Sequence, residues 1–90
     1  MTSDPPKATV RLFAALKDAA GTACIEVDAP TTVDALLAHL ATSLGAKFAE
    51  RLRLAAVMID GNPVAKDEGV EVPAGVEVAL LPPFAGGSAA

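Results

Sequence analysis

The sequence predicts a single α+β domain in which one main helix crosses a mixed β-sheet. Three observations predict this class: two strand-like runs open the chain, one amphipathic helix follows, and further apolar strands come after it. Strands that precede and follow a single main helix along the chain are typical of a two-layer arrangement, in which the helix and the sheet bury their apolar faces against each other. The 90 residues suffice for one such domain with a small core.

The first two strands are expected at residues 8–14 (ATVRLFA) and 23–28 (ACIEVD). In the first run Val10 and Leu12 point to one side, and Arg11 and Phe13 point to the other. This two-residue period is typical of a half-buried strand. The connector LKDAAG between them ends at Gly21. It is short enough for the two strands to pair as a hairpin with a longer loop.

The main helix is expected after Pro30. Thr31 or Thr32 can cap its N-terminus, and Asp34 is favourable in the first turn. Gly45 ends it. Its apolar stripe follows the spacing i, i+3, i+4, i+7, i+11 and consists of Val33, Leu36, Leu37, Leu40 and Leu44.

A shorter helix is expected over residues 46–54, with Phe48 and Leu52 facing inward. His39 lies opposite the apolar stripe of the main helix. We therefore expect His39 to be a solvated helix residue rather than a ligand or a base.

The remaining strands are bounded by turn residues. Residues 55–59 (AAVMI) form a buried strand closed by the turn at 60–61, and residues 63–65 form a short return strand kept at an edge by its proline. The turn at 73–75 precedes a final strand at 76–81 (VEVALL).

This order of elements is the β-grasp, or ubiquitin-like, arrangement. In it the first and last strands lie side by side and parallel at the centre of the sheet. We expect residues 1–7 to be a flexible leader, residues 8–81 the β-grasp domain, and residues 82–90 an extended C-terminal tail that contains Gly-Gly.

Composition excludes several classes of function. A net charge of −4 with 7 Lys and Arg argues against nucleic acid as a partner and favours a protein partner that offers a basic surface. We see no signal peptide and no membrane span, and expect a cytoplasmic protein. The single cysteine, Cys24, excludes an internal disulfide and a multi-cysteine metal cluster, and is expected to be a small buried hydrophobe.

The outer face of the sheet carries two apolar residues that a solvated face would not favour. Val10 and Leu12 should face the helix, as should Val76, Val78 and Leu80. The opposite face then carries Arg11 and Phe13 from the first strand, with Glu77, Ala79 and Leu81 from the last. Arg11 and Glu77 suit a cross-strand ion pair. Phe13 and Leu81 predict a docking patch, which Pro63 or Val64 could extend.

The C-terminal residues LLPPFAGGSAA indicate a tail that enters another protein. Pro82 and Pro83 direct the chain out of the sheet in an extended path, and Phe84 supplies one apolar anchor. Gly86 and Gly87 have no side chains and so fit a narrow channel. Such a tail suits a carrier whose own terminal carboxylate is activated by ATP as an acyl-adenylate and then receives sulfur as a thiocarboxylate.

Four segments carry a resemblance to a known family: VRLFA, TTVDALLAHL, AAVMIDG and EVALLPPFAGG. Together they resemble the MoaD/ThiS sulfur-carrier family over residues 8–87, most closely its MoaD branch, the small subunit of molybdopterin synthase. The resemblance implies a chain without catalytic residues, metal or cofactor of its own. It implies that an E1-like adenylating enzyme binds through Phe13 and Leu81 and activates Gly87, with Lys17 as a basic contact to the partners.

The same resemblance implies two further partners, a sulfurtransferase and the large subunit of molybdopterin synthase, which takes up the tail. The sequence departs from the family where the chain continues through Ser88, Ala89 and Ala90. Because Gly87 is then in a peptide bond, we expect cleavage between Gly87 and Ser88 by a JAMM-type protease. The alternatives are that the extension is an artefact or that this copy is inactive.

Three other functions stay open from the sequence. The carrier could serve cysteine, thiamine or a secondary metabolite instead of molybdopterin. It could be a ubiquitin-like modifier that conjugates Gly87 to lysines. It could be a binding module whose tail has no chemical role.

Overall fold

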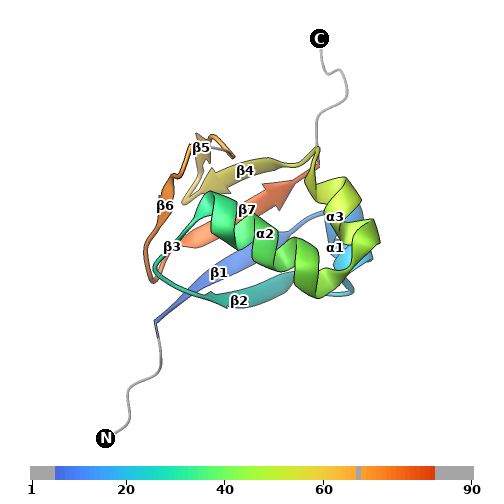
Figure 1. Cartoon of the computed structure of the whole chain (residues 1–90), viewed down its shortest axis with the longest axis horizontal. Coiled ribbons are helices and arrows are strands. Elements are labelled where there is room, and N and C mark those ends of the chain that lie inside the picture. Colours follow the sequence, from blue (N-terminus) through green and yellow to red (C-terminus); the bar gives the residue numbers. More distant parts are fainter. Residues whose placement is uncertain (1–5, 67, 83–90) are drawn as a thin grey trace, which may run out of the picture.

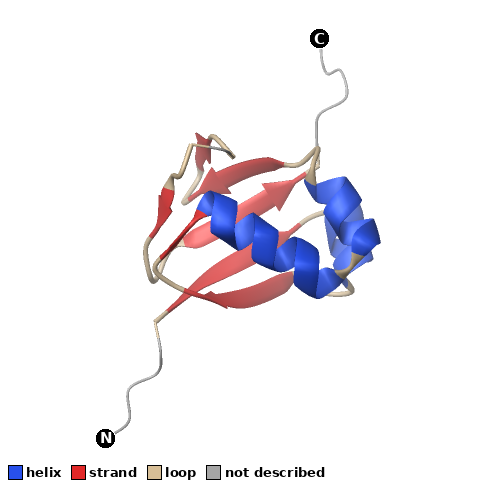
Figure 2. Ribbon diagram, viewed as in Figure 1, coloured by secondary structure: helices blue, strands red, loops and turns tan. Residues whose placement is uncertain are grey.

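The computed structural model describes residues 6–66 and 68–82, and shows helices packed on one face of a sheet (Figure 1). The main sheet has the order β2-β1-β7-β4-β5. Its strands are β1 (Lys7–Leu12), β2 (Cys24–Asp28), β4 (Ala56–Ile59), β5 (Asn62–Val64) and β7 (Glu77–Leu81). The helices in Figure 2 are α1 (Ala15–Ala20), α2 (Val33–Leu44) and α3 (Ala46–Leu52). A second, two-stranded sheet pairs β3 (Thr31–Thr32) with β6 (Glu71–Val72).

The pairing of the strands confirms the β-grasp prediction. β1 pairs with β2 antiparallel and with β7 parallel, so the first and last strands are neighbours at the centre of the sheet. β4 pairs antiparallel with both β7 and β5. Because β1 and β7 are parallel, Phe13, which follows β1, lies at the same end of the molecule as Pro82, which follows β7.

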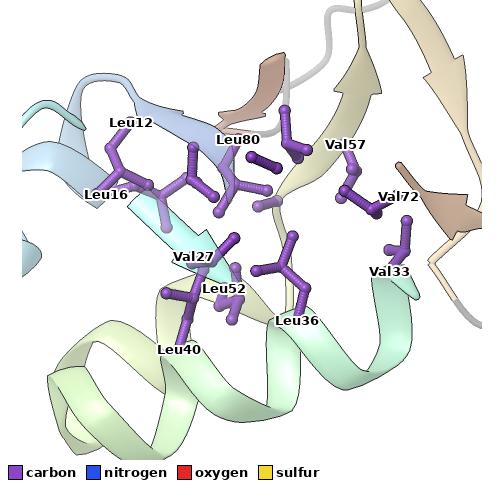
Figure 3. Packing of buried hydrophobic residues seen from close by; sticks show 14 of the residues in the cluster. Leu12, Leu16, Val27, Val33, Leu36, Leu40, Leu52, Val57, Val72 and Leu80 are labelled. Atoms are coloured by element: carbon purple, nitrogen blue, oxygen red, sulfur yellow. The ribbon is translucent and has the colours of Figure 1, made fainter. Parts of the chain in front are cut away.

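The core lies between α2 and the inner face of the sheet (Figure 3). The stripe on α2 contributes Val33, Leu36 and Leu40, which are buried, while Leu37 and Leu44 are half-buried at its margin. Thr32 is the residue that caps α2: its Oγ1 accepts a hydrogen bond from the backbone N–H of Ala35 at 3.2 Å. The sheet and α3 complete the buried set with residues that include Leu12, Val57, Val78, Leu80, Phe48 and Leu52.

Two features were absent from the sequence-based prediction. The expected connector after the first strand is the six-residue helix α1, which ends at Gly21 in a left-handed conformation with φ 79°. Six residues are too few to display a helical period, so no pattern could indicate it. The pair β3–β6 joins two-residue segments that are far apart in the chain, and only the fold brings them together.

The prediction that Cys24 is buried was wrong. Cys24 is exposed, because the half-buried Ile25 and the buried Val27 occupy the inner face of β2 and side chains alternate along a strand. His39 is exposed on α2, as expected. The bounds of the other predicted elements differ from the observed ones by one or two residues. None of the described helices is long and apolar enough to cross a bilayer.

Candidate docking face and C-terminal exit

The outer face of the sheet brings together one residue from every strand. In register, Cys24 on β2 is opposite Arg11 on β1, Arg11 is beside Ala79 on β7, and Ala79 is opposite Met58 on β4. Met58 is in turn opposite Pro63 on β5. Four of the five side chains in this row are uncharged, so the face opposite the helices is largely apolar across its middle.

Phe13 and Leu81 lie at the end of this face from which the tail departs. Phe13 follows β1 directly and is 39 % exposed, whereas Leu81 is half-buried at the end of β7 opposite Ala56. The outward orientation expected of these two residues therefore holds for both. Their role in binding a partner remains a prediction.

The one charged residue of this row, Arg11, forms an ion pair on the same face. Arg11 Nη1 donates to Glu77 Oε2 at 3.1 Å, and both side chains are about half exposed. Glu77 is held by its backbone, since its N–H donates to Asp60 Oδ1 at 3.0 Å. A pair this exposed contributes little to stability. The neighbouring Ala79 and Met58 are half-buried.

The described chain ends at Pro82, which is half-buried directly after β7. The predicted site residues Pro83, Phe84, Gly86, Gly87 and Ser88 lie outside the described residues. Lys17 is exposed on α1, near the end of the molecule from which the tail departs, because α1 follows β1 and β1 is parallel to β7.

Sequence reasoning missed three residues of this face. Met58 and Ala56 join it through the pairing of β4 with β7. Leu54 is 68 % exposed, in the turn that leads from α3 into β4 beside the end of β7. A leucine in a turn shows no period, so only the fold identifies it as part of the surface around the tail.

A hollow lies on the other side of the molecule, between α2 and α3. It has a volume of about 510 Å³ and a mostly apolar lining that includes Leu37, Ala41 and Leu52. Two polar side chains of its lining already have hydrogen-bond partners within the chain. Asp34 Oδ1 accepts from the N–H of Gly69 at 3.0 Å, and Lys66 Nζ donates to the carbonyls of Leu52 and Arg53 at 3.0 and 2.8 Å.

Burial lowers the pKa of Lys66, because its ammonium is partly withdrawn from water. The two carbonyls at the end of α3 that it contacts give it a structural role. Within residues 6–66 and 68–82, no group of three or more His, Cys, Asp or Glu side chains is placed to hold a metal ion. The described part of the chain thus presents a largely apolar outer face that reaches the end of β7, directly before Pro82.

The model of the ThiS family matches residues 10–87, which is most of the chain. The chain belongs to the ThiS family. The resemblance to MoaD/ThiS proteins inferred from the sequence is thereby confirmed. Comparison with curated protein sequences gave no match.

Solved structures similar to this ThiS-family chain include small archaeal modifier protein 1 of Haloferax volcanii. One crystal structure of it is 28 % identical with a TM-score of 0.70, covering 88 % of this chain and 99 % of that one. Another is 31 % identical with a TM-score of 0.64, covering 89 % and 98 %. A chain from the complex of subunits 1 and 2 of molybdopterin-converting factor from Helicobacter pylori 26695 is 20 % identical, with a TM-score of 0.67 and coverage of 87 % and 95 %.

Proposed function

We propose that this chain is a sulfur carrier for molybdopterin synthesis, whose Gly87 carboxylate is adenylated and then thiocarboxylated. The carboxylate oxygen attacks the α-phosphate of ATP and displaces pyrophosphate. Sulfide (HS⁻) then attacks the acyl carbon and AMP leaves; loss of the S–H proton to solvent produces the thiocarboxylate. The chain itself supplies the carboxylate and the docking surface, while the partner enzymes supply the catalytic groups.

One observation carries the proposal: the apolar outer face is continuous with the point where the tail departs. Phe13 and Leu81 lie at that end, with Ala56 beside Leu81 and Leu54 in the adjoining turn. A partner that binds there is positioned to receive the tail, and the contact area supplies the affinity that a slender tail alone lacks. The side-chain-free Gly86 and Gly87 then suit a narrow channel.

The proposal includes four partners. An E1-like adenylating enzyme activates Gly87, a sulfurtransferase delivers sulfur, and the large subunit of molybdopterin synthase accepts the loaded tail. Support for the last comes from the Helicobacter pylori structure of similar fold, in which subunits 1 and 2 form a complex. A JAMM-type protease removes Ser88–Ala90 first, because the Gly87 carbonyl is otherwise an amide. The proposal keeps the cytoplasmic location expected from the sequence.

Intact mass spectrometry of the protein purified from its own cells tests the proposal. A species that ends at Gly87 with sulfur in place of one oxygen is the expected result. A chain that ends only at Ala90, even when the pathway is induced, would contradict the carrier function. Loss of molybdopterin in cells carrying Gly87→Ala, with cysteine and thiamine synthesis intact, distinguishes the proposed pathway from the other two.

A second candidate function is protein modification, favoured by the similarity to small archaeal modifier protein 1 of Haloferax volcanii. A modifier uses the same activated Gly87 but transfers its acyl group to a lysine amine. Digestion of cell extracts with trypsin would then leave a C-terminal remnant of this chain on lysines of other proteins. Such adducts, abolished by Gly87→Ala, would establish this function beside or instead of sulfur transfer.

A further inference from the structure

Positive and negative side chains gather at opposite ends of the described part of this chain, along the direction of the strands. Of the 7 Lys and Arg in the sequence, four lie on α1, on α3 or directly after α3. These four are Lys17, Lys47, Arg51 and Arg53, and all are exposed. The same elements carry only two acids, Asp18 and Glu50.

The fold puts these four cations around the exit of the tail. α1 follows β1, which is parallel to β7, and α3 leads into β4, whose Ala56 is opposite Leu81 at the end of β7. α1 and α3 pack against each other, and a hollow of about 240 Å³ between them is lined by Asp18, Lys47 and Arg51. Figure 1 shows both helices at the end of the molecule where β7 terminates.

The opposite end of the molecule is acidic. Six acids lie near the start of β1 and β7, the end of β4 and the start of α2: Asp28, Asp34, Asp60, Glu68, Glu71 and Glu77. The two ion pairs found within residues 6–66 and 68–82 join Lys7 to Asp28 and Arg11 to Glu77. Neither pair involves a cation of the tail end, so these four keep their charge available to a partner.

The geometry points to a second docking surface, the basic end formed by Lys17, Lys47, Arg51 and Arg53, which fits an acidic patch on the enzyme that activates the tail. This inference rests on the proposed function, because it concerns how that enzyme approaches Gly87. The net charge of −4 suggested a basic partner surface, but the surface that surrounds the tail has the opposite sign.

Because the positive and negative ends are separated, a charged partner affects the orientation of the chain as well as attracting it. An acidic patch attracts the basic end and repels the acidic end, so the chain approaches with its tail toward the partner. Encounters in the productive orientation become more frequent, and the association rate rises at low ionic strength. Nucleic acid is a poorer occupant, because a phosphate backbone needs a longer basic track than four cations on a chain of net negative charge.

The test measures association with the E1-like enzyme encoded in the same genome, using the chain that ends at Gly87. Stopped-flow fluorescence gives the association rate from low salt to about 0.5 M NaCl, where the Debye length falls well below 10 Å. Pyrophosphate release gives adenylation independently. Arg51→Gln is compared with Lys7→Gln, a matched control that removes one positive charge from the acidic end, and with the double variant Lys47→Gln/Arg51→Gln.

We expect Arg51→Gln to slow association about threefold at low salt and the double variant about tenfold, with both losses disappearing at high salt. Lys7→Gln should leave the rate unchanged or lower it less. Equal rates for Arg51→Gln and Lys7→Gln would overturn the inference, as would tighter binding of single-stranded DNA than of the enzyme. Charge-dependent binding without adenylation would contradict the proposed function and leave the basic end established.

Discussion

One phenylalanine of this chain is exposed and another is buried. Replacing each by alanine therefore distinguishes an effect on partner binding from an effect on the stability of the fold. Phe13 is 39 % exposed on the outer face of the sheet, whereas Phe48 is fully buried between the helices and the sheet. We expect Phe13→Ala to weaken binding of the adenylating enzyme with a modest loss of stability. Phe48→Ala should do the reverse.

The magnitude for Phe13 follows from its exposed area. A phenylalanine side chain presents about 200 Å², so 39 % exposure leaves about 80 Å² for a partner to cover. At about 25 cal/mol per Å², covering that area contributes about 2 kcal/mol, which is roughly 30-fold in Kd. Truncation of Phe48, which leaves a cavity, should lower the free energy of unfolding by about 3–5 kcal/mol.

Isothermal titration calorimetry with the adenylating enzyme measures Kd, and urea unfolding measures stability. Both are done at a temperature at which circular dichroism shows each variant folded. The expected outcome is a crossed pattern, in which Phe13→Ala has the larger effect on Kd and Phe48→Ala the larger effect on stability. Wild-type affinity for Phe13→Ala would show that the outer face is not the docking surface.

Three further predictions concern local interactions of the fold. Thr32→Ala removes the hydroxyl that accepts from the N–H of Ala35, and should lower the free energy of unfolding by about 1 kcal/mol in urea titrations, whereas Thr32→Ser should not. Lys7, whose ammonium is 2.7 Å from Asp28 Oδ1, lowers the pKa of Asp28 below its ordinary 3.8; Lys7→Gln should return it toward that value in an NMR titration, and no change would contradict the pairing. Because the folded-state pKa is the lower one, the contribution of Asp28 to stability is present above its ordinary pKa and is lost as the pH falls through the lowered value. Asp60 has a positive φ of 48° and accepts from the N–H of Glu77, so Asp60→Ala should destabilise the chain by about 1–2 kcal/mol and Asp60→Asn by less, again by urea unfolding.

Local patterns in the sequence were sufficient to predict most of the elements. The spacing of Val33, Leu36 and Leu40 predicted α2 and the side that it buries, because a helix repeats every 3.6 residues whatever it packs against. Alternation along β1 and β7 predicted which of their residues face outward, and the Arg11–Glu77 pair confirmed that assignment. α1 was missed because six residues do not complete two helical turns.

Cys24 shows why composition is a weaker guide than register. The apolar run ACIEV suggested that Cys24 is buried, but the pairing of Cys24 with the outward-facing Arg11 puts it on the outer face. The exposure of Leu54 could not be predicted either, because it lies in a turn, and a turn has no regular spacing that distinguishes buried from exposed positions. For Cys24 and Leu54, the hydrophobicity of the side chain alone did not indicate whether it faces the core or the solvent.

The sequence by itself determined the order of the five strands of the main sheet and of α2 and α3, and the buried face of α2, because these depend on residues near one another in the chain. The chemistry of the Gly-Gly tail stays a prediction. Only the tertiary structure decided which distant residues share a surface. Parallel pairing of β1 with β7 brings Phe13 to the same end as Leu81, and it gathers Lys17 and the cations of α3 around the exit of the tail. The physical reason is that pairing between strands more than 60 residues apart is set by backbone hydrogen bonds and a shared core, which no local period records.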